Sequence, residues 1–469
     1  MGTELLIRSY NVGCGDCIYV RIPNDDDGFH ILIDCGTKDE AAVLKHAVSH
    51  LRDNMLPDTG SSGNKRLDLV VVTHQHEDHI KGFDPEFFKG IVIKNIWATA
   101  AMDDTHKQAK RAQALHTFAV REMSAIAKSD MALSPELHNL LGLYGIGNAG
   151  ATTAITKGTL GAKKIKTDFV YAGLTSEKLG VNIKDTLITV LGPEKDIDRF
   201  YLGKEADESL LGLQKGIAHF QNDITTIATA KPTNISIIDF RKLQSRILSN
   251  GLAFVLNDSS LQNNVSVVLL VEWMGRRLLF VGDAEWDAGF KEGRKNASWN
   301  VMWELRQEYL SKPVDFLKVG HHGSFNATPW DPDVANNEGV NKILNSILPL
   351  PKGAKKPTAQ CIVSTKRKQY DTIPDAQLLS ELGKRVRNTQ VYKKYLKGKN
   401  AAFLPERDIF NYSVLKSYSK PPSPIEVGDK DWLGKKQPQR TDFESNNYGD
   451  KDWNMKIAFV DVVITPKKM

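Results

Sequence analysis

Histidine and aspartate side chains crowd into one short stretch of the sequence, THQHEDH at positions 73–79. His74 and His76 lie two residues apart, and on an extended chain this spacing turns both rings to the same side, where they can share one metal ion. Asp78 and His79 follow as the chain turns and can serve a second ion. Imidazole nitrogen and carboxylate oxygen suit Zn²⁺ and also Mn²⁺ or Fe²⁺. A polar loop that caps the next helix is the alternative, but four ligand-type residues in six positions favour a metal site.

Three further stretches carry ligand-type residues where an apolar strand ends. The stretch FVGD places Asp283 after a glycine, a natural position for a ligand that bridges two ions. The stretch FLKVGHHGS places His321 and His322 after another strand, followed by Ser324 as a candidate substrate-binding side chain. Asp34 ends the strand ILID and is predicted to orient a liganding histidine. Each could alone be a satisfied polar residue, but together they predict a ligand set at one edge of the fold.

Apolar periodicity indicates the elements that must position these side chains. Alternating apolar residues, or short apolar runs bounded by glycine, indicate strands, and apolar residues at helical spacing indicate helices. Strand, loop and helix alternate along the chain, which is typical of layered α/β packing. The expected strands are 4–12, 17–22, 29–34, 67–72, 91–99, 186–192, 265–272, 277–281, 314–319 and 360–364, and the expected helices are 38–51, 104–127 and 284–310.

Two long segments and the tail do not follow this alternation. We interpret about 101–185 and 194–263 as insertions into a domain that spans 1–400. The tail, 401–469, is read as an extension that docks back on this domain, because it ends in a strand-like run. The motif GDKDW occurs twice in the tail, which is too few copies for a solenoid.

Composition excludes several classes of protein. With 469 residues, 41% hydrophobic and 25% charged, the chain is typical of a globular protein with a large core. It has no run of eighteen apolar residues and no secretory pattern at its start, so we expect a cytoplasmic protein without a membrane span. Cys14 and Cys17 have CxxC spacing, but no matching pair follows, and we interpret them as small half-buried thiols.

The net charge of +6 permits a polyanionic substrate without requiring one. Lysine and arginine are dense between residues 352 and 399, with tyrosines between them. They could form a track for nucleic acid, in which charge holds phosphates and rings stack on bases. They could equally be the solvated face of a helix whose buried face carries Leu378, Leu379, Leu382 and Val386.

The order of motifs resembles the metallo-β-lactamase superfamily. The motifs are NVGCGD, LIDCG, THQHEDH, VLGP, NNVSVVLL, LLFVGD and LKVGHHGS, and they are most similar to the hydrolase domain of ComEC-type DNA-competence proteins and its free-standing relatives. The resemblance covers residues 4–100 and 186–330 well and 357–375 loosely. It implies a four-layer αββα sandwich with the metals at one edge of two sheets.

The sequence departs from the family pattern at the first metal site. Many superfamily members have a histidine after the glycine of the segment that here reads LGPE. The first site is therefore short of a ligand unless Glu194, Asp196 or His219 substitutes, and Glu194 is the candidate we adopt.

A second departure follows the strand 360–364, where relatives often carry a histidine before a proline. This chain has none there, so protonation of the leaving group would fall to Lys368 or Tyr370. Lys366 and Arg367, in the same stretch, are candidates for binding the substrate.

The resemblance implies hydrolysis by a metal-bound hydroxide, with one or two divalent ions, Zn²⁺ favoured and Mn²⁺ as the alternative. Asp283 would bridge the ions, and Asp78 would be both a ligand and a group that orients the nucleophile. A phosphodiester gains most from such a site, because its transition state concentrates negative charge beside the cations.

Three functions follow from these observations. The first is a phosphodiesterase or nuclease acting on nucleic acid or a nucleotide. The second is a hydrolase of a small ester, lactone or phosphoester, because a fold does not fix its substrate. The third is a metal-binding subunit of a multi-protein system, for example in defence or DNA processing, with a protein partner docked through the insertions.

Overall fold

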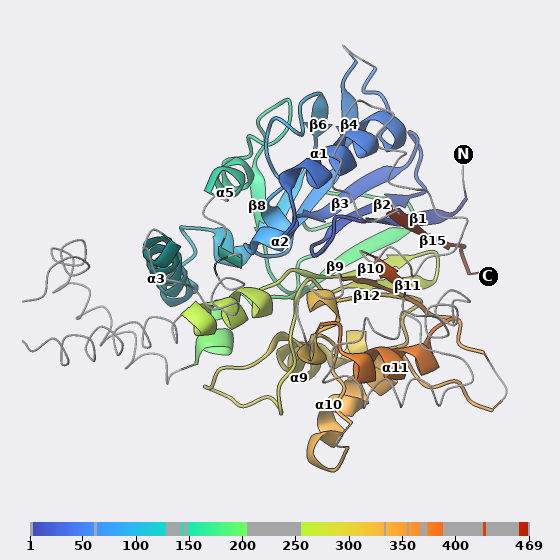
Figure 1. The fold of residues 1–469 in the computed structure, drawn as a ribbon. Helices are drawn as coiled ribbons and strands as arrows, with labels where there is room; N and C mark the ends of the chain where they lie inside the picture. Colours follow the sequence, from blue (N-terminus) through green and yellow to red (C-terminus); the bar gives the residue numbers. More distant parts are fainter. Residues whose placement is uncertain are drawn as a thin grey trace, which may run out of the picture.

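Apolar strands form two sheets that lie face to face, and helices cover the outer side of each sheet (Figure 1). The computed structural model describes residues 3–60, 63–127, 141, 143–144, 149–203, 255–332, 334–353, 356–365, 373–387, 425–427 and 459–467. None of the described helices has the length and apolar character needed to cross a membrane.

The first sheet has the strand order β15-β1-β2-β3-β5-β7-β8. Neighbours from β15 to β3 pair antiparallel, and neighbours from β3 to β8 pair parallel. The runs FHILIDC in β3 and LVVV in β5 are buried along their whole length, as expected for strands covered on both faces. The bounds are β1 (Leu5–Tyr10), β2 (Cys17–Ile22), β3 (Phe29–Cys35), β5 (Leu69–Val72), β7 (Ile96–Thr99), β8 (Thr167–Val170) and β15 (Phe459–Ile464).

The second sheet has the strand order β14-β13-β12-β11-β10-β9. Its neighbours are parallel from β14 to β11 and antiparallel from β11 to β9. The bounds are β9 (Thr186–Gly192), β10 (Val268–Trp273), β11 (Arg276–Phe280), β12 (Phe316–Val319), β13 (Gln360–Ser364) and β14 (Ile425–Val427). A separate two-stranded sheet pairs β4 (Lys65–Leu67) with β6 (Ile91–Ile93).

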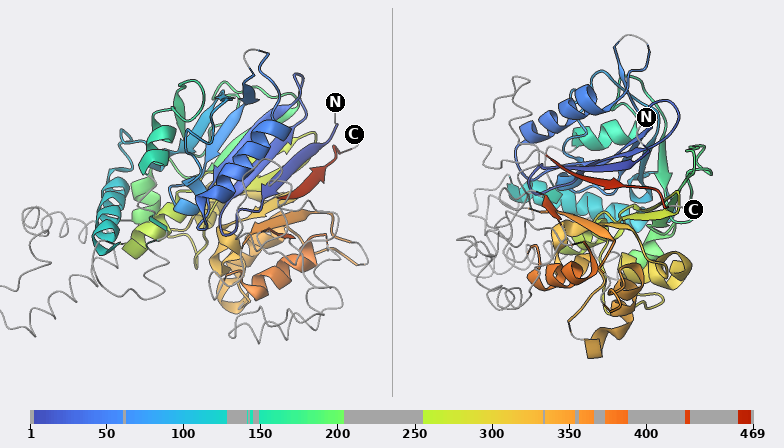
Figure 2. Two further views of the ribbon diagram at one scale, coloured as in Figure 1. Left: turned by 45° about the horizontal axis from the view of Figure 1, so that its top comes forward. Right: turned by 90° about the vertical axis from the view of Figure 1, so that its right-hand side faces the viewer.

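Helices lie outside both sheets (Figure 2). On the first sheet lie α1 (Ala41–His50), which continues into the π-helical turn η1 (Leu51–Met55), and α5 (Ala149–Thr156). On the second lie α9 (Ser298–Leu310), α10 (Val334–Ile347) and α11 (Ala376–Arg385). The remaining elements are α2 (Glu77–Ile80), α3 (Lys110–Ala127), η2 (Ala100–Met102), η3 (Asp198–Leu202), η4 (His321–Gly323) and η5 (Phe325–Ala327).

Three apolar clusters separate the four layers. Successive residues of a strand point to opposite faces, so Val71 packs between the sheets while Val70 packs under α1 and α5. In the second sheet, Leu278 likewise faces the first sheet, and Leu279 packs against α9, α10 and α11. The predicted layered α/β sandwich is therefore confirmed.

Several predicted elements differ in extent. The expected strand 91–99 is divided into β6 and β7, and the expected helix 284–310 is helical only in α9. The expected insertion 101–185 contains β8, an edge strand of the first sheet, so the inserted part ends before that strand. Both GDKDW motifs lie outside the described residues.

Candidate metal centre

Two strands of each sheet end at the same edge of the sandwich. Asp34 lies at the end of β3, His74 follows β5, Asp283 follows β11 and His322 follows β12. Gly282 lets the two sheets approach here, because its φ is +53° and a Cβ atom would meet the side chains of Ser266 and Thr73 at about 3 Å. The segments that follow these strands therefore bring their side chains into one cluster.

The first group in this cluster consists of His74, His76 and Asp283, which are at most 2% exposed. Nε2 of His74 lies 3.1 Å from Nδ1 of His76 and 3.9 Å from Oδ2 of Asp283. One ligand atom from each of the three residues lies within 4.8 Å of the other two. This separation suits three ligands around one ion.

The second group shares Asp283 with the first and adds His79 and His322. Nε2 of His79 lies 3.2 Å from Oδ2 of Asp283, and Nε2 of His322 lies 3.0 Å from Oδ2 of Asp78. Asp283 therefore lies between the two groups, in the position that a bridging carboxylate occupies.

Hydrogen bonds behind the cluster fix the orientation of its histidines. Oδ2 of Asp34 lies 2.8 Å from Nδ1 of His79, and the same carboxylate accepts hydrogen bonds from the backbone N–H and the hydroxyl of Thr73. Nδ1 of His322 lies 2.8 Å from the carbonyl oxygen of Ser364 and must donate to it. Each ring thereby turns its Nε2 toward the cluster, as metal-binding histidines do.

Buried atoms without a hydrogen-bond partner show that the cluster fits a cation. Among the described residues, these atoms include Nε2 of His76, Nε2 of His79 and Oδ1 of Asp78. Leaving such atoms buried and unpaired is costly unless an ion binds them. The donor set of imidazole and carboxylate is the one that Zn²⁺ and related divalent ions prefer.

The charge of the cluster leads to the same conclusion. Four carboxylates in it are at most 2% exposed, namely Asp16, Asp34, Asp78 and Asp283. Two lysines face them: Nζ of Lys318 lies 2.8 Å from Asp16, and Nζ of Lys38 lies 3.6 Å from Asp78. The carboxylates thus outnumber these lysines by two, and the excess negative charge attracts positive charge, carried either by protons on His79 and His322, whose pKa values it raises, or by a divalent cation.

The histidines differ in their readiness to bind a proton. Burial lowers the pKa of His76 to about 4 and, with the charges of His79 and His76, holds the pKa of His74 well below its ordinary value. Burial also acts to lower the pKa of His79, but Asp283 and Asp34 outweigh it and raise that pKa well above its ordinary value. The first two rings are thus neutral at ordinary pH, while the position of His79 attracts positive charge.

Two predicted ligands, Glu194 and His321, belong to none of the groups of potential metal ligands among the described residues. Glu194 pairs with Arg306 through both carboxylate oxygens, so its charge is already neutralised, and it belongs to no group of potential ligands among the described residues. The side chain of His321 is 23% exposed, its Nδ1 lies 3.6 Å from Glu285, and it belongs to no group of potential ligands among the described residues. The backbone N–H of His321 donates to Asp283 at 2.9 Å.

Other predicted site residues stay untested. Lys366, Arg367, Lys368, Tyr370 and His219 lie outside the described residues. The hydroxyl of Ser324 donates to the side chain of Asn326 at 2.7 Å, within its own loop. Asp196 accepts a hydrogen bond from the backbone N–H of Arg199, also within its own turn.

Neither Lys38 nor Lys318 was predicted to lie beside the carboxylates. Lys318 interrupts the apolar run FLKV of β12. A lysine within such a run could have indicated a buried positive charge that needs an acidic partner. Lys38 gave no comparable signal, because only the folded chain brings it next to Asp78.

A pocket adjoins His76 on the side of the insertions. It consists of two adjoining hollows of about 400 and 320 Å³ that share Gln75, His116 and Thr117 in their walls. Helices α3 and α5 contribute most of the larger hollow, which His76 and Tyr144 also line. The described parts of the insertions thus wall a cavity beside the first group of ligands.

A buried carboxylate holds this pocket wall together. Oδ2 of Asp258 lies 2.9 Å from Nδ1 of His116 and accepts a hydrogen bond of 2.7 Å from the hydroxyl of Tyr144. The three residues come from segments far apart in the sequence, so no local motif could have predicted their contact.

Residues 11–99, which contain THQHEDH, match the family model described as the Metallo-beta-lactamase superfamily. No curated protein matches the chain. Among solved structures, the metallo-beta-lactamase fold protein YhfI from Bacillus subtilis is similar at 8% identity, with a TM-score of 0.26 over 67% of this chain and 70% of that one.

Two other solved structures are similarly distant. A protein of unknown function from Enterococcus faecalis V583 has 10% identity and a TM-score of 0.28, over 70% of this chain and 53% of that one. Zn(2+)-bound PqqB from Methylobacterium extorquens has 11% identity and a TM-score of 0.29, over 72% and 77%. The similarity of this chain to the superfamily therefore rests on the matched segment, residues 11–99.

Proposed function

We propose that this chain, whose residues 11–99 belong to the metallo-beta-lactamase superfamily, is a hydrolase that depends on one or two divalent cations. Members of that superfamily are mostly metal-dependent hydrolases. The observation that carries the proposal is the pair of buried ligand groups that share Asp283 at the edge of the two sheets.

The ligand groups suggest how the cations would be held. His74, His76 and Asp283 would hold one ion, and Asp283 with His79 and His322 would hold another. A bound divalent cation supplies a Lewis acid, which lowers the pKa of water and neutralises charge on the attacked phosphorus or carbonyl.

Other residues of the chain would prepare this chemistry. Asp34 holds the ring of His79 in one orientation, and Ser364 does the same for His322. The side chain of Lys38 is 7% exposed and its ammonium group lies 3.6 Å from Asp78, so it adds positive charge beside the cluster, which would favour a negatively charged substrate.

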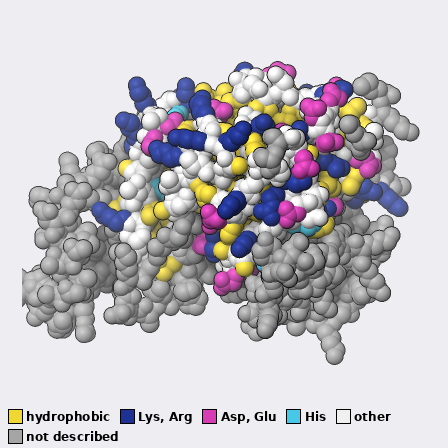
Figure 3. Space-filling view, turned by 90° about the horizontal axis from the view of Figure 1, so that it is seen from above, with side chains coloured by type: hydrophobic (Ala, Val, Ile, Leu, Met, Phe, Trp, Pro, Cys, Tyr) yellow, Lys and Arg dark blue, Asp and Glu magenta, His cyan; other side chains and the backbone are white. Residues whose placement is uncertain are grey.

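We favour phosphodiester substrates and a relationship to ComEC-type hydrolase domains. The order of motifs from NVGCGD to GHHGS supports the relationship, and the basic segment 352–399 supports a polyanion. Figure 3 shows that Lys and Arg on the described part of one face are spread among Asp and Glu, so that face offers no continuous basic track. We propose that the segment 352–399 is the part of the chain that binds nucleic acid.

A small neutral substrate is the second candidate, and the pocket beside His76 favours it. The described residues that line its two hollows include no lysine or arginine. Its polar side chains include those of Gln75, Asp104, His116, Thr117 and Ser124. A hollow of about 400 Å³ is large enough for a small ester or lactone.

Metal analysis combined with a substrate screen tests the proposal. The full chain is stripped with a chelator, reloaded with Zn²⁺ or Mn²⁺, and assayed on bis(p-nitrophenyl) phosphate, DNA, RNA, a cyclic dinucleotide, p-nitrophenyl acetate and a lactone. We expect bound metal and metal-dependent turnover of at least one phosphodiester. Turnover of the ester or lactone alone would select the second candidate.

The matched variants are His74→Ala/His76→Ala and, as a control, His106→Ala. His106 lies outside the cluster and bonds to the carbonyl oxygen of Lys195. The double variant should lose metal and activity while circular dichroism stays unchanged, and the control should keep both. Full metal content in the double variant would refute the proposed centre.

A further inference from the structure

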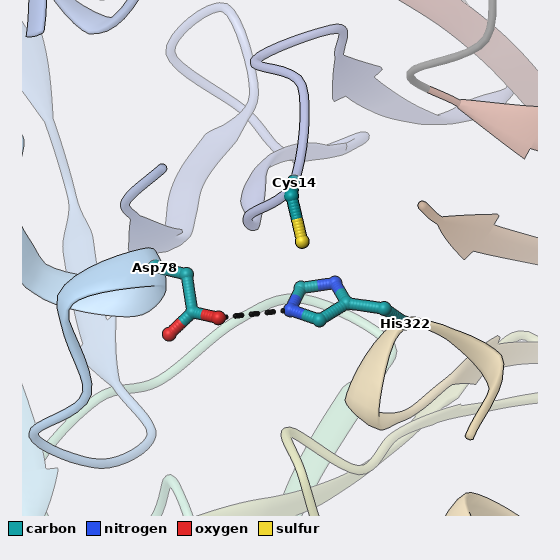
Figure 4. Close-up of side chains that lie close together, drawn as sticks. All are labelled: Cys14, Asp78 and His322. Carbon is teal, nitrogen blue, oxygen red and sulfur yellow. Dashed lines mark hydrogen bonds and ion pairs between the residues drawn. The ribbon is translucent and has the colours of Figure 1, made fainter. Parts of the chain in front are cut away.

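Cys14 lies against the second ligand group. Its sulfur, a carboxylate oxygen of Asp78 and a ring nitrogen of His322 lie within 4.8 Å of one another, and all three residues are at most 2% exposed. Figure 4 shows the thiol of Cys14 pointing toward the imidazole ring of His322, with Asp78 bonded to the same ring.

The turn between β1 and β2 holds Cys14 rigidly in this place. The backbone N–H of Lys38 donates to the carbonyl oxygen of Cys14 at 2.8 Å, and the N–H of Asp16 donates to the carbonyl oxygen of Asp78 at 2.9 Å. Gly15 permits the close approach, because a Cβ atom there would collide with the backbone of the loop after β3. The thiol is thus fixed from two sides against the segment that carries Asp78.

The surroundings of Cys14 differ from those of the other three cysteines. Cys17 and Cys35 belong to the apolar cluster under α1, and Cys361 belongs to the one under α9. Cys14 is equally buried, yet it belongs to none of the apolar clusters formed by the described residues. Its neighbours are a carboxylate and an imidazole, so simple apolar packing does not account for its position.

Unpaired ligand atoms lie in the same place. Oδ1 of Asp78 and Nε2 of His79 are buried without a hydrogen-bond partner. Asp78 belongs to the same group of potential ligands as Cys14, and His79 belongs to the second group, which also contains His322. Nδ1 of His322 faces the carbonyl oxygen of Ser364, so Nε2 is the ring nitrogen that faces the carboxylate of Asp78, at 3.0 Å. A proton or a metal ion must lie between these two atoms, and Cys14 lies beside both residues.

The arrangement does not fit a nucleophilic thiol. In a Cys-His-Asp triad the histidine bonds to the nucleophile through one ring nitrogen and to the carboxylate through the other. Here Nδ1 of His322 is occupied by a backbone carbonyl, and Asp78 uses Nε2, so no nitrogen remains to relay a proton from Cys14 to Asp78.

We propose that Cys14 is a metal ligand, and that Cys14, Asp78 and His322 form a thiolate-carboxylate-imidazole set that selects Zn²⁺ for the second position. The inference rests on the proposed metal centre and makes it more specific. Thiolate is a soft ligand that Zn²⁺ and Co²⁺ bind well, whereas Mn²⁺ prefers oxygen. The second position should therefore discriminate between these ions more strongly than a site of histidine and carboxylate alone.

Cobalt spectroscopy tests this assignment without an activity assay. The stripped full chain is titrated with Co²⁺, whose visible bands report binding and whose near-ultraviolet charge-transfer band reports a bond to thiolate. The wild type should show both signals. Cys14→Ser should keep the visible bands and lose the thiolate band, and Cys17→Ser, a buried cysteine in the same turn region, should keep both.

Zinc affinity gives an independent measure. Cys14→Ser and Cys14→Ala should bind Zn²⁺ at the second position roughly 10–100-fold more weakly, the loss that follows even when a group behind a metal ligand is removed. Mn²⁺ binding should change little in either variant. Two variants are used because serine could retain a weak oxygen contact that alanine cannot make.

The outcomes separate the two proposals. Visible cobalt bands without a thiolate band in the wild type, or equal Zn²⁺ affinity in wild type and both Cys14 variants, would overturn the assignment of Cys14 and leave the metal centre standing. A wild type that binds no Co²⁺ would overturn both.

Discussion

At the scale of single residues, the centre is built from side chains held in unusual backbone conformations. Asp34, His321 and His322 all have positive φ, at 55°, 43° and 53°. Non-glycine residues adopt this region at a cost of about 1–3 kcal/mol each, and such residues concentrate at functional sites. The strain at His322 aims its ring into the cluster, whereas the strain at His321 positions a backbone N–H that binds Asp283.

The neighbouring histidines therefore offer a matched pair of variants. His322→Gly should weaken metal binding by roughly 10–100-fold or more, because a buried ligand is lost. His321→Gly should leave metal content unchanged and preserve the N–H that bonds to Asp283. Each substitution places glycine at a residue with positive φ, where glycine is not strained. The backbone contribution to stability should therefore be similar in the two variants. Metal analysis after dialysis checks this, and equal loss in both variants would contradict it.

Glu194 gives a second prediction at this scale. Its side chain and that of Arg306 are 9% and 16% exposed, so Glu194→Gln leaves a buried guanidinium poorly paired. We expect a loss of about 1–3 kcal/mol in the free energy of unfolding with unchanged metal content. Glu292→Gln is the control: its pair with Arg199 is more than half exposed, so the free energy of unfolding should change little. Urea unfolding and metal analysis of each variant test this prediction. Selective loss of one ion in Glu194→Gln would show that Glu194 is a ligand after all.

At the scale of elements, buried apolar runs predicted the strands well. Side-chain hydrogen bonds explain why two predicted elements differ in extent from the observed ones. The expected strand 91–99 breaks where the side chain of Asn95 donates to the carbonyl oxygen of Asp68. The expected helix 284–310 begins only at Ser298, because Asn296 bonds to the carbonyls of Lys291 and Arg294 and holds a loop. Apolar periodicity carries no information about such bonds, so it gives the type of an element better than its ends.

A buried histidine between strands β2 and β3 predicts how the stability of the fold changes with pH. His30 on β3 is 1% exposed, and its Nδ1 lies 2.7 Å from the hydroxyl of Tyr19 on β2. Burial lowers the pKa of His30 to about 4, below the value of about 6.5 in an unfolded chain. Between these values the unfolded state binds more protons, so stability falls as pH decreases from about 6.5 to about 4 and is level above.

Replacing this histidine should remove its share of the acid sensitivity. His30→Asn should be less stable than wild type at pH 7, because the bond to Tyr19 is weakened, and the two should converge toward pH 4. The difference in unfolding free energy should shrink by roughly 2–3 kcal/mol over this range, because the pKa of His30 is about 4 in the folded chain and about 6.5 in the unfolded chain. Urea unfolding at several pH values measures it, and parallel curves would show that His30 does not titrate in this window.

At the scale of the whole molecule, chain topology decides which site residues could be predicted. The histidines of THQHEDH, with Asp283 and His322, were predictable because each directly follows a buried strand, and neighbouring parallel strands end at one edge. Lys38, the Arg306 partner of Glu194 and the environment of Cys14 were not, because they depend on how distant segments pack. The same applies to the pair between Arg8 and Asp461, which joins β1 to β15 from positions 453 residues apart.

The net charge of +6 and the basic segment 352–399 lead to the last prediction, which concerns long substrates. Each lysine or arginine that contacts a phosphate releases condensed counterions, so binding of nucleic acid weakens steeply with salt. Changing Lys366, Arg367 and Lys368 together to Glu should weaken binding and flatten the logarithmic salt dependence by up to about 3 units on duplex DNA.

The matched control changes Lys163, Lys164 and Lys166 to Glu, which alters net charge equally at exposed positions before β8. Binding is measured by fluorescence anisotropy over a range of salt concentrations, and turnover is measured on DNA and on bis(p-nitrophenyl) phosphate. Only the first triple variant should lose binding and DNA turnover, while turnover of the small phosphodiester stays within about twofold in both, since the metal ligands are intact. Equal losses in both variants would show that only the net charge of the protein matters. No loss in either variant would favour the small neutral substrate that the pocket beside His76 accommodates.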